Sequence, residues 1–300
     1  MATATPTKPS RNAIAHATTP LTLWHLLSLD APTVAVLWTW FIAASNHIHL
    51  PHSATLAMAV TVWTLYAADR LMDTSLLDTD PASYKDLETR HYFHHRHRAA
   101  FLTGIVFASI ALAVLLPRLD TEAIHLYLIL GALVLGYFIL IHATRTTSAQ
   151  QELAHRMPKE IAVGLCFAAA TFIPTVARRP DLRLPLLPSA LLFAALCSLN
   201  CLFIYAWEHE DSRTNPLAHP ITQLALRNLP LLTTLLLLAA TLLTLFDHLA
   251  PRTIPSAIAA ATSLLLLLHL RRFTISRITL RAAADLALTT PLLLLPLLLR

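Results

Sequence analysis

The sequence predicts an all-α polytopic membrane protein, a single bundle of about nine transmembrane helices. Three observations lead to this class. The 300 residues are 56% hydrophobic and only 13% charged, whereas a soluble domain carries roughly 25% charged residues. Apolar windows near 20 residues long, enough for a helix to cross about 30 Å of hydrocarbon, follow one another along the chain. The basic residues, which give a net charge of +5, stand in short loops between these windows, so a nucleic-acid partner is not expected.

The expected elements begin after a polar tail. Residues 1–20 are rich in Thr, Ala and Pro and lack the apolar core of a secretory signal, so this segment is predicted to be disordered. Residues 21–300 then form one helical domain in the lipid bilayer. Its predicted spans are residues 22–45, 53–73, 99–117, 122–142, 159–178, 185–207, 229–247, 254–270 and 281–299.

The distribution of Lys and Arg sets the expected orientation. With the N-terminus inside, sixteen of the 22 basic residues fall on the inner side, and the positive-inside rule favours this arrangement. The segment 178–183, RRPDLR, is basic although it falls on the outer side. A multi-pass protein of the cytoplasmic (inner) membrane is therefore expected, with its N-terminus inside and its C-terminus outside.

Two other kinds of site have little support in the sequence. Cys166, Cys197 and Cys201 lie in apolar runs without metal-ligand spacing to histidine, which indicates small core residues rather than disulfides or a zinc site. No span is visibly interrupted by Gly and Pro in paired positions, as the broken helices of many transporters are. No G-x-x-x-G pair marks a dimer face, so the oligomeric state stays open.

Two acids end the second predicted span, in the stretch TVWTLYAADRLMD. Asp69 and Asp73 are four residues apart, so a helix places them on one face, one turn from each other. Carboxylate oxygens in this arrangement suit Mg2+ and, through it, a phosphate group. The competing interpretation is a pair of solvated acids at a helix end, with Arg70 extending to the interface.

A second acidic cluster ends the sixth predicted span at the same inner surface. Glu208 and Asp211 are three residues apart, again on one helical face, while Glu210 between them is interpreted as a solvated loop acid. Lys159 opens the fifth span on this side. Two carboxylate clusters and a cation are groups that can hold Mg2+ and a diphosphate, and apolar walls would suit a hydrocarbon tail.

At these motifs the sequence resembles the UbiA superfamily of intramembrane prenyltransferases. The matching stretches are DRLMD in the second span, MPKEIAVG around Lys159 and EHED after the sixth. In that family an N-D-x-x-D-x-x-x-D motif and a second D-x-x-D-like motif bind Mg2+ and the prenyl diphosphate, in a bundle of nine helices with its site toward the cytoplasm. Leu65 and Tyr66 stand where the family usually has Asn-Asp, and Glu208 takes a place usually held by Asp.

The resemblance implies a role for each candidate residue. The implied Mg2+ ligands are Asp69, Asp73, Glu208 and Asp211, the groups that neutralise the diphosphate are Lys159 and Arg70, and the substrate contacts are Asp30, Asn200 and Tyr66. The implied reaction moves a prenyl chain from prenyl diphosphate to a lipophilic, aromatic acceptor. The alternative is a non-catalytic relative that binds an isoprenoid or quinone-like lipid, or joins a membrane complex, because the Asn-Asp is missing.

Two acids outside the motifs also stand out. Asp30 precedes Pro32 in the first span, where a charge is costly unless it faces a cavity. It is therefore expected to contact the acceptor, to pair with a basic side chain, or simply to start a helix. Asp285, near the start of the ninth span, is predicted to pair with Arg281 four residues earlier.

Overall fold

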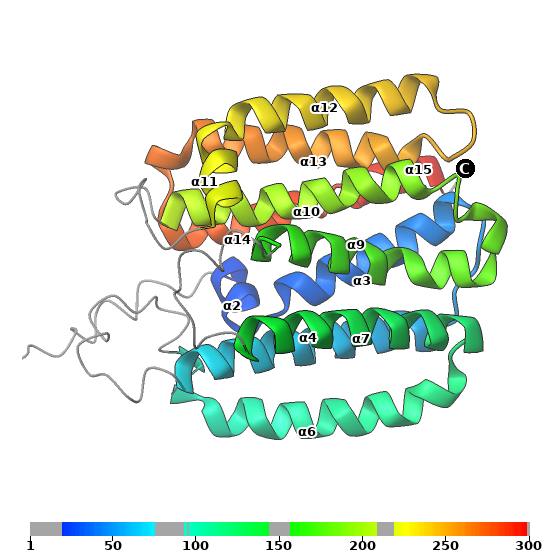
Figure 1. Cartoon of the computed structure of the whole chain (residues 1–300), viewed down its shortest axis with the longest axis vertical. Helices are drawn as coiled ribbons and strands as arrows, with labels where there is room; N and C mark the ends of the chain where they lie inside the picture. The colour runs from blue at the N-terminus through cyan, green and yellow to red at the C-terminus, as the bar shows by residue number, and fades with distance from the viewer. Residues whose placement is uncertain (1–19, 76–92, 95, 144–156, 209–218, 299–300) are drawn as a thin grey trace, which may run out of the picture.

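A computed structural model describes residues 20–75, 93–94, 96–143, 157–208 and 219–298. Within these residues the regular elements are all helical (Figure 1), which confirms the all-α class. The tail before residue 20 and the predicted metal ligand Asp211 lie outside the described residues.

The helices follow the predicted apolar windows closely. The first half of the chain contains α2 (Pro20–Leu26), α3 (Asp30–Ser45), α4 (His52–Ser75), α6 (Arg98–Leu115) and α7 (Thr121–Ala143). The second half contains α9 (Lys159–Arg178), α10 (Leu187–Glu208), the short α11 (Pro220–Arg227), α12 (Leu229–Phe246), α13 (Thr253–Leu270), α14 (Arg277–Ala287) and α15 (Pro291–Leu298). Single turns of 3-10 helix, η3 (Leu116–Arg118), η4 (Pro180–Leu182) and η6 (Arg272–Thr274), lie in three of the connections.

Five helical segments of the described chain are long and apolar enough to cross a membrane. They are Arg98–Arg118, which joins α6 to η3, together with α9, α10, α12 and α13. Only 6% of the apolar window in Arg98–Arg118 is buried inside the protein, against 50% in α9 and in α10. An apolar helix this exposed requires an apolar surrounding, so the fold indicates a membrane protein.

The long helices run back and forth, so that the helix ends that carry or adjoin the acidic motifs lie on one side of the bundle. In Figure 1 the C-terminal ends of α4, α10 and α13 and the N-terminal ends of α9 and α14 all lie on the left. We call this the motif end of the bundle. Two side-chain contacts support the grouping: Arg281 of α14 forms an ion pair with Glu208 of α10, and Thr222 donates a hydrogen bond to Glu160 of α9 over 3.0 Å.

Separate contacts hold the opposite end of the bundle together. Arg183 forms an ion pair with Glu122 over 2.6 Å, which ties the η4 connection to the start of α7. The hydroxyl of Thr253, the first residue of α13, donates to Ser45, the last residue of α3, over 2.9 Å. The two ends are thus fixed by different sets of polar contacts.

The first predicted span is interrupted just before Asp30, and the expectation of continuous spans is wrong here. Ser28 between α2 and α3 has a φ of 59°, in the left-handed region that no helix residue adopts. Gly is the usual residue in that conformation, so a Ser inside the apolar run 22–45 did not signal the break. The turn brings the side chain of His25 to within 2.6 Å of the Asp30 carboxylate.

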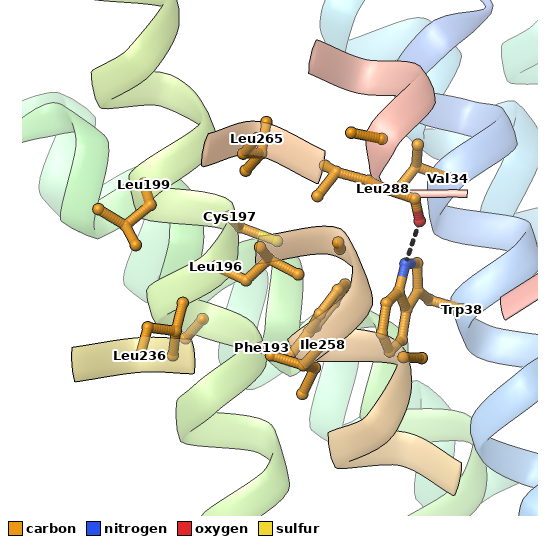
Figure 2. Close-up of a cluster of buried hydrophobic side chains, with 14 of the residues drawn as sticks. Val34, Trp38, Phe193, Leu196, Cys197, Leu199, Leu236, Ile258, Leu265 and Leu288 are labelled. Atoms are coloured by element: carbon orange, nitrogen blue, oxygen red, sulfur yellow. Dashed lines mark hydrogen bonds between the residues drawn. The ribbon is translucent and has the colours of Figure 1, made fainter. Parts of the chain in front are cut away.

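The last predicted span is interrupted as well, between α14 and α15. Thr290 in the break donates its hydroxyl hydrogen to the Ala257 carbonyl over 2.8 Å, and Pro291, which has no N–H, begins α15. The Leu288 carbonyl accepts a hydrogen bond from the indole N–H of Trp38 over 2.7 Å (Figure 2). The Leu288 carbonyl, which the break frees, is therefore satisfied from another helix, as a bilayer interior requires.

The main core lies between α3, α9, α10, α12, α13 and α14. Figure 2 shows its centre, where Trp38 packs against Phe193 with ring centroids 4.2 Å apart and Ile258 lies beside them. Gly164 of α9 lies directly against α10: a Cβ at this position would overlap Ser198 Oγ and lie 2.5 Å from the Ala194 carbonyl oxygen. The three cysteines are free thiols within these helices.

Candidate functional site

The candidate site begins at the break in the first span. Asp30 is the first residue of α3 and only 2% exposed, and its Oδ1 accepts a hydrogen bond from the Ala31 N–H over 2.9 Å. A carboxylate in the first turn of a helix is stabilised by the backbone N–H groups there. The turn through Ser28 brings His25 back toward this carboxylate, so that His25 Nδ1 lies 2.6 Å from Asp30 Oδ2.

Arg70 reaches the same place from α4. Its guanidinium donates to the His25 carbonyl over 2.9 Å and to Ser28 Oγ over 2.8 Å, and it lies 3.4 Å from Asp30 Oδ2. The side chain is only 5% exposed. Arg70 therefore holds both the backbone turn and the Asp30 carboxylate. Of the three alternatives for Asp30, the structure shows two, a basic partner and a position at the start of a helix.

Asp285 of α14 and Asn200 of α10 complete the cluster. Asp285 Oδ2 lies 3.9 Å from His25 Nδ1, and Asp285 Oδ1 accepts a hydrogen bond from the Asn200 amide over 3.0 Å. The other end of that amide, Asn200 Oδ1, is buried and has no hydrogen-bond partner among the described residues. We call the set of His25, Asp30, Arg70, Asn200 and Asp285 the polar centre.

The polar centre contains more acidic than basic groups. Two carboxyl groups face one guanidinium inside a largely apolar bundle. A net charge is costly there unless it is compensated. The ligand atoms of His25, Asp30 and Asp285 all lie within 4.8 Å of one another, so this set could hold a cation.

Two predicted metal ligands can be placed at the motif end. Asp69 is a half-buried residue of α4 next to Arg70. Glu208, the last residue of α10, is also half-buried, and its carboxylate forms the ion pair with Arg281. The side chain of Asp73 lies outside the described part of the chain, although its backbone belongs to α4.

The predicted pair of Asp285 with Arg281 is wrong. Both residues belong to α14, but they lie one turn apart and their partners are different: Arg281 meets Glu208 at the end of α10, and Asp285 meets Asn200 and His25 deeper in the bundle. The spacing allowed a pair along the helix, but both side chains have partners on other helices.

Residues predicted to contact the substrate or the diphosphate lie in two groups. Asp30 and Asn200 belong to the polar centre, and Tyr66, one turn before Arg70 on α4, lies within electrostatic range of Asp30 and Asp285. Lys159 is exposed at the start of α9. Arg70, expected beside it at the diphosphate, is instead buried in the polar centre.

Sequence reasoning did not identify His25. It stands five residues before Asp30 in WHLLSLD, a spacing that a continuous helix would place on different faces. The break makes the pair, and the sequence signal that could have marked it is a polar Ser two residues before an acid inside an apolar run.

The structure also has a cavity of about 430 Å³ between the end of α3 and the start of α4. Its lining includes Trp40 and the histidines His47, His49 and His52. Ser45, at this end of α3, contacts Thr253 at the opposite end of the bundle from the motifs, so the cavity does not belong to the polar centre.

Comparison with protein-family models, curated proteins and solved structures found no match for this chain. The fold and the site together define an all-α protein that has helices long and apolar enough to cross a membrane. Its polar centre lies where α2, α3, α4, α10 and α14 meet.

Proposed function

We propose that the chain is a nine-span prenyltransferase of the cytoplasmic (inner) membrane, with its N-terminus inside, and that it resembles the UbiA superfamily. It would transfer a prenyl chain from prenyl diphosphate to a lipophilic, aromatic acceptor. The observation that carries the proposal is the motif end, where the end of α4 with Asp69, the start of α9 with Lys159 and the end of α10 with Glu208 lie on the same side of the bundle (Figure 1).

The donor set suits Mg2+. Asp69 and Glu208 offer only carboxylate oxygens and are half-buried at the motif end, and hard divalent cations prefer oxygen ligands. Asp73 and Asp211 would complete the set. Bound there, Mg2+ would neutralise the oxygens of the diphosphate. Lys159, exposed at the same end, would meet the remaining negative charge.

The reaction is a substitution at an allylic carbon. The carbon–oxygen bond of the prenyl diphosphate breaks, and both electrons leave with the diphosphate. A carbon of the acceptor attacks the resulting allylic cation, and an aromatic acceptor then loses a proton to solvent. The chain contributes by stabilising the charge on the leaving group and by surrounding the cation with apolar helices that exclude water.

Binding of a non-hydrolysable prenyl diphosphate analogue to the purified protein in detergent tests this proposal. We expect binding in Mg2+ that disappears with excess chelator and is reduced at least about tenfold in Asp69→Ala, because a metal ligand is lost. Asp181→Asn changes an exposed acid of η4 and serves as the matched control. Undiminished analogue binding and prenyl transfer by Asp69→Ala would refute the assignment.

A second candidate is a non-catalytic protein that binds an uncharged isoprenoid or quinone-like lipid. The observation in its favour is that Arg70 and Glu208 already have partners, Asp30 and Arg281 respectively, in addition to the missing Asn-Asp. A binder of an uncharged lipid would retain its ligand in the presence of chelator. The same experiment with a quinone in place of the diphosphate analogue therefore separates the two functions.

A further inference from the structure

The polar centre has the donor set of a metal site that differs from the proposed Mg2+ ligands. It combines one imidazole nitrogen of His25 with carboxylate oxygens of Asp30 and Asp285, from three different helices or their junctions. Metal–ligand distances of roughly 2.0–2.2 Å require ligand atoms about 3–4 Å apart. The observed separations from His25 Nδ1, 2.6 Å to Asp30 and 3.9 Å to Asp285, are within a few tenths of an ångström of that range.

Asn200 supplies a second, independent observation. Its side chain lies beside the centre, because its amide nitrogen donates to Asp285 Oδ1 over 3.0 Å. The residue is 5% exposed, and its Oδ1 has no hydrogen-bond partner among the described residues. A buried amide oxygen without a partner has lost the hydrogen bond that water would give it, and coordination to a cation would compensate for that loss.

Arg70 plays the part of a positioning residue in this arrangement. Carboxylates that bind metals are themselves hydrogen-bonded by outer groups, which fix their orientation. Arg70 lies 3.4 Å from Asp30 Oδ2 and also holds Ser28, so it fixes the turn between the two ligands His25 and Asp30. Its positive charge also offsets part of the negative charge of the two acids.

The imidazole decides the class of metal. Mg2+ and Ca2+ take oxygen ligands almost entirely, whereas Mn2+, Zn2+ and their first-row neighbours accept an imidazole nitrogen beside carboxylates. We propose that His25, Asp30, Asp285 and Asn200 form a buried site for a first-row divalent metal, distinct from the Mg2+ ligands of the proposed transferase. The bound metal leaves one positive unit of charge, which an anion or hydroxide would balance.

Pulsed EPR of Mn2+ tests this site. The protein is purified without a histidine tag, stripped with chelator and given less than one equivalent of Mn2+ in detergent, with no prenyl diphosphate present. We expect a Mn2+ signal with nitrogen hyperfine coupling from His25. Zn2+ should displace this ion, while millimolar Mg2+ should displace only Mn2+ held by oxygen ligands.

Three variants make the test specific. His25→Gln should abolish the nitrogen coupling, and Asp285→Asn should weaken Mn2+ binding at least about tenfold. His125→Gln changes an exposed histidine of α7 and should leave the signal unchanged. The thermal unfolding midpoint of each variant shows whether it is folded, and Asp285→Asn, which preserves side-chain shape, covers the case that His25→Gln does not fold.

The result that overturns the proposal is equally direct. Mn2+ that shows no nitrogen coupling, or coupling that persists in folded His25→Gln, means that the polar centre is a metal-free hydrogen-bond network. This outcome does not depend on the transferase proposal, because that proposal is tested by analogue binding in Mg2+ and in Asp69→Ala. Either one can fail while the other stands.

Discussion

Arg70 shows how much of the site depends on one side chain. It bonds to a carbonyl, a hydroxyl and a carboxylate that all belong to residues 25–30. A guanidinium can do this because its five N–H donors lie in a fixed plane. The break between α2 and α3 is therefore held from outside, by α4, as well as by the conformation of Ser28.

Removal of Arg70 should destabilise the fold strongly. In Arg70→Met the Asp30 carboxylate stays buried without its guanidinium, and breaking a buried pair in this way costs roughly 3–5 kcal/mol. Equilibrium unfolding in detergent measures the loss. The double variant with Asp30→Asn should recover part of it, because the unpaired charge is then gone.

The matched control is Arg179→Met, which breaks an exposed pair with Asp181 and should change stability little. Equal losses in both single variants would contradict this account.

The residues of the candidate site were predictable to different degrees. Asp30 was recognisable because an acid inside an apolar window needs a partner, and Asn200 because it lies inside span six before an acid cluster. The pairing of His25 with Asp30, and of Asp285 with Asn200 instead of Arg281, could not be predicted. These pairs depend on a backbone break and on contacts between helices far apart in sequence. The spacing of residues along one helix predicts neither.

At the scale of elements, the positions of the helices were predictable and their interruptions were not. Apolar windows follow from the cost of exposing polar backbone in lipid, and each window coincides with helix in the described residues. The breaks at Ser28 and at Thr289–Thr290 involve no Gly. Their free backbone groups are satisfied locally or by other helices, as when Thr289 donates to the Leu286 carbonyl. The sequence argument against a broken-helix transporter therefore no longer holds.

The contact between α9 and α10 gives a prediction for a helix pair. Gly164→Ala introduces a methyl group against Ser198 Oγ and the α10 backbone, and overpacking of this kind costs about 1–3 kcal/mol. Gly131→Ala on α7 is the matched control, since a Cβ there meets no atom within 4 Å and alanine favours a helix over glycine. Equilibrium unfolding should show a loss for the first variant and none for the second. A stable Gly164→Ala protein would show that the two helices can separate without cost.

For the whole molecule, the alternation of the helices has a direct experimental consequence. If the motif end faces the cytoplasm, a cysteine in η6 is inside and a cysteine in η4 is outside. We expect a membrane-impermeant maleimide to label Asp181→Cys in right-side-out vesicles and to label Thr274→Cys only after permeabilisation. The wild-type cysteines lie within apolar helices and serve as the unlabelled control. The reverse pattern would place the motif end outside and the basic segment 178–183 inside.

The junction of the interrupted helices also bears on how the protein is made. Asp30 enters the membrane early in synthesis, but Asp285, which lies near the same histidine, is made only after seven further spans of the proposed topology. Until α14 arrives, the first span must hold a buried acid and a histidine with Arg70 as their partner from α4. The polar centre is thus completed only when α14 has been made, and a chain that ends before α14 lacks the Asp285 carboxyl group.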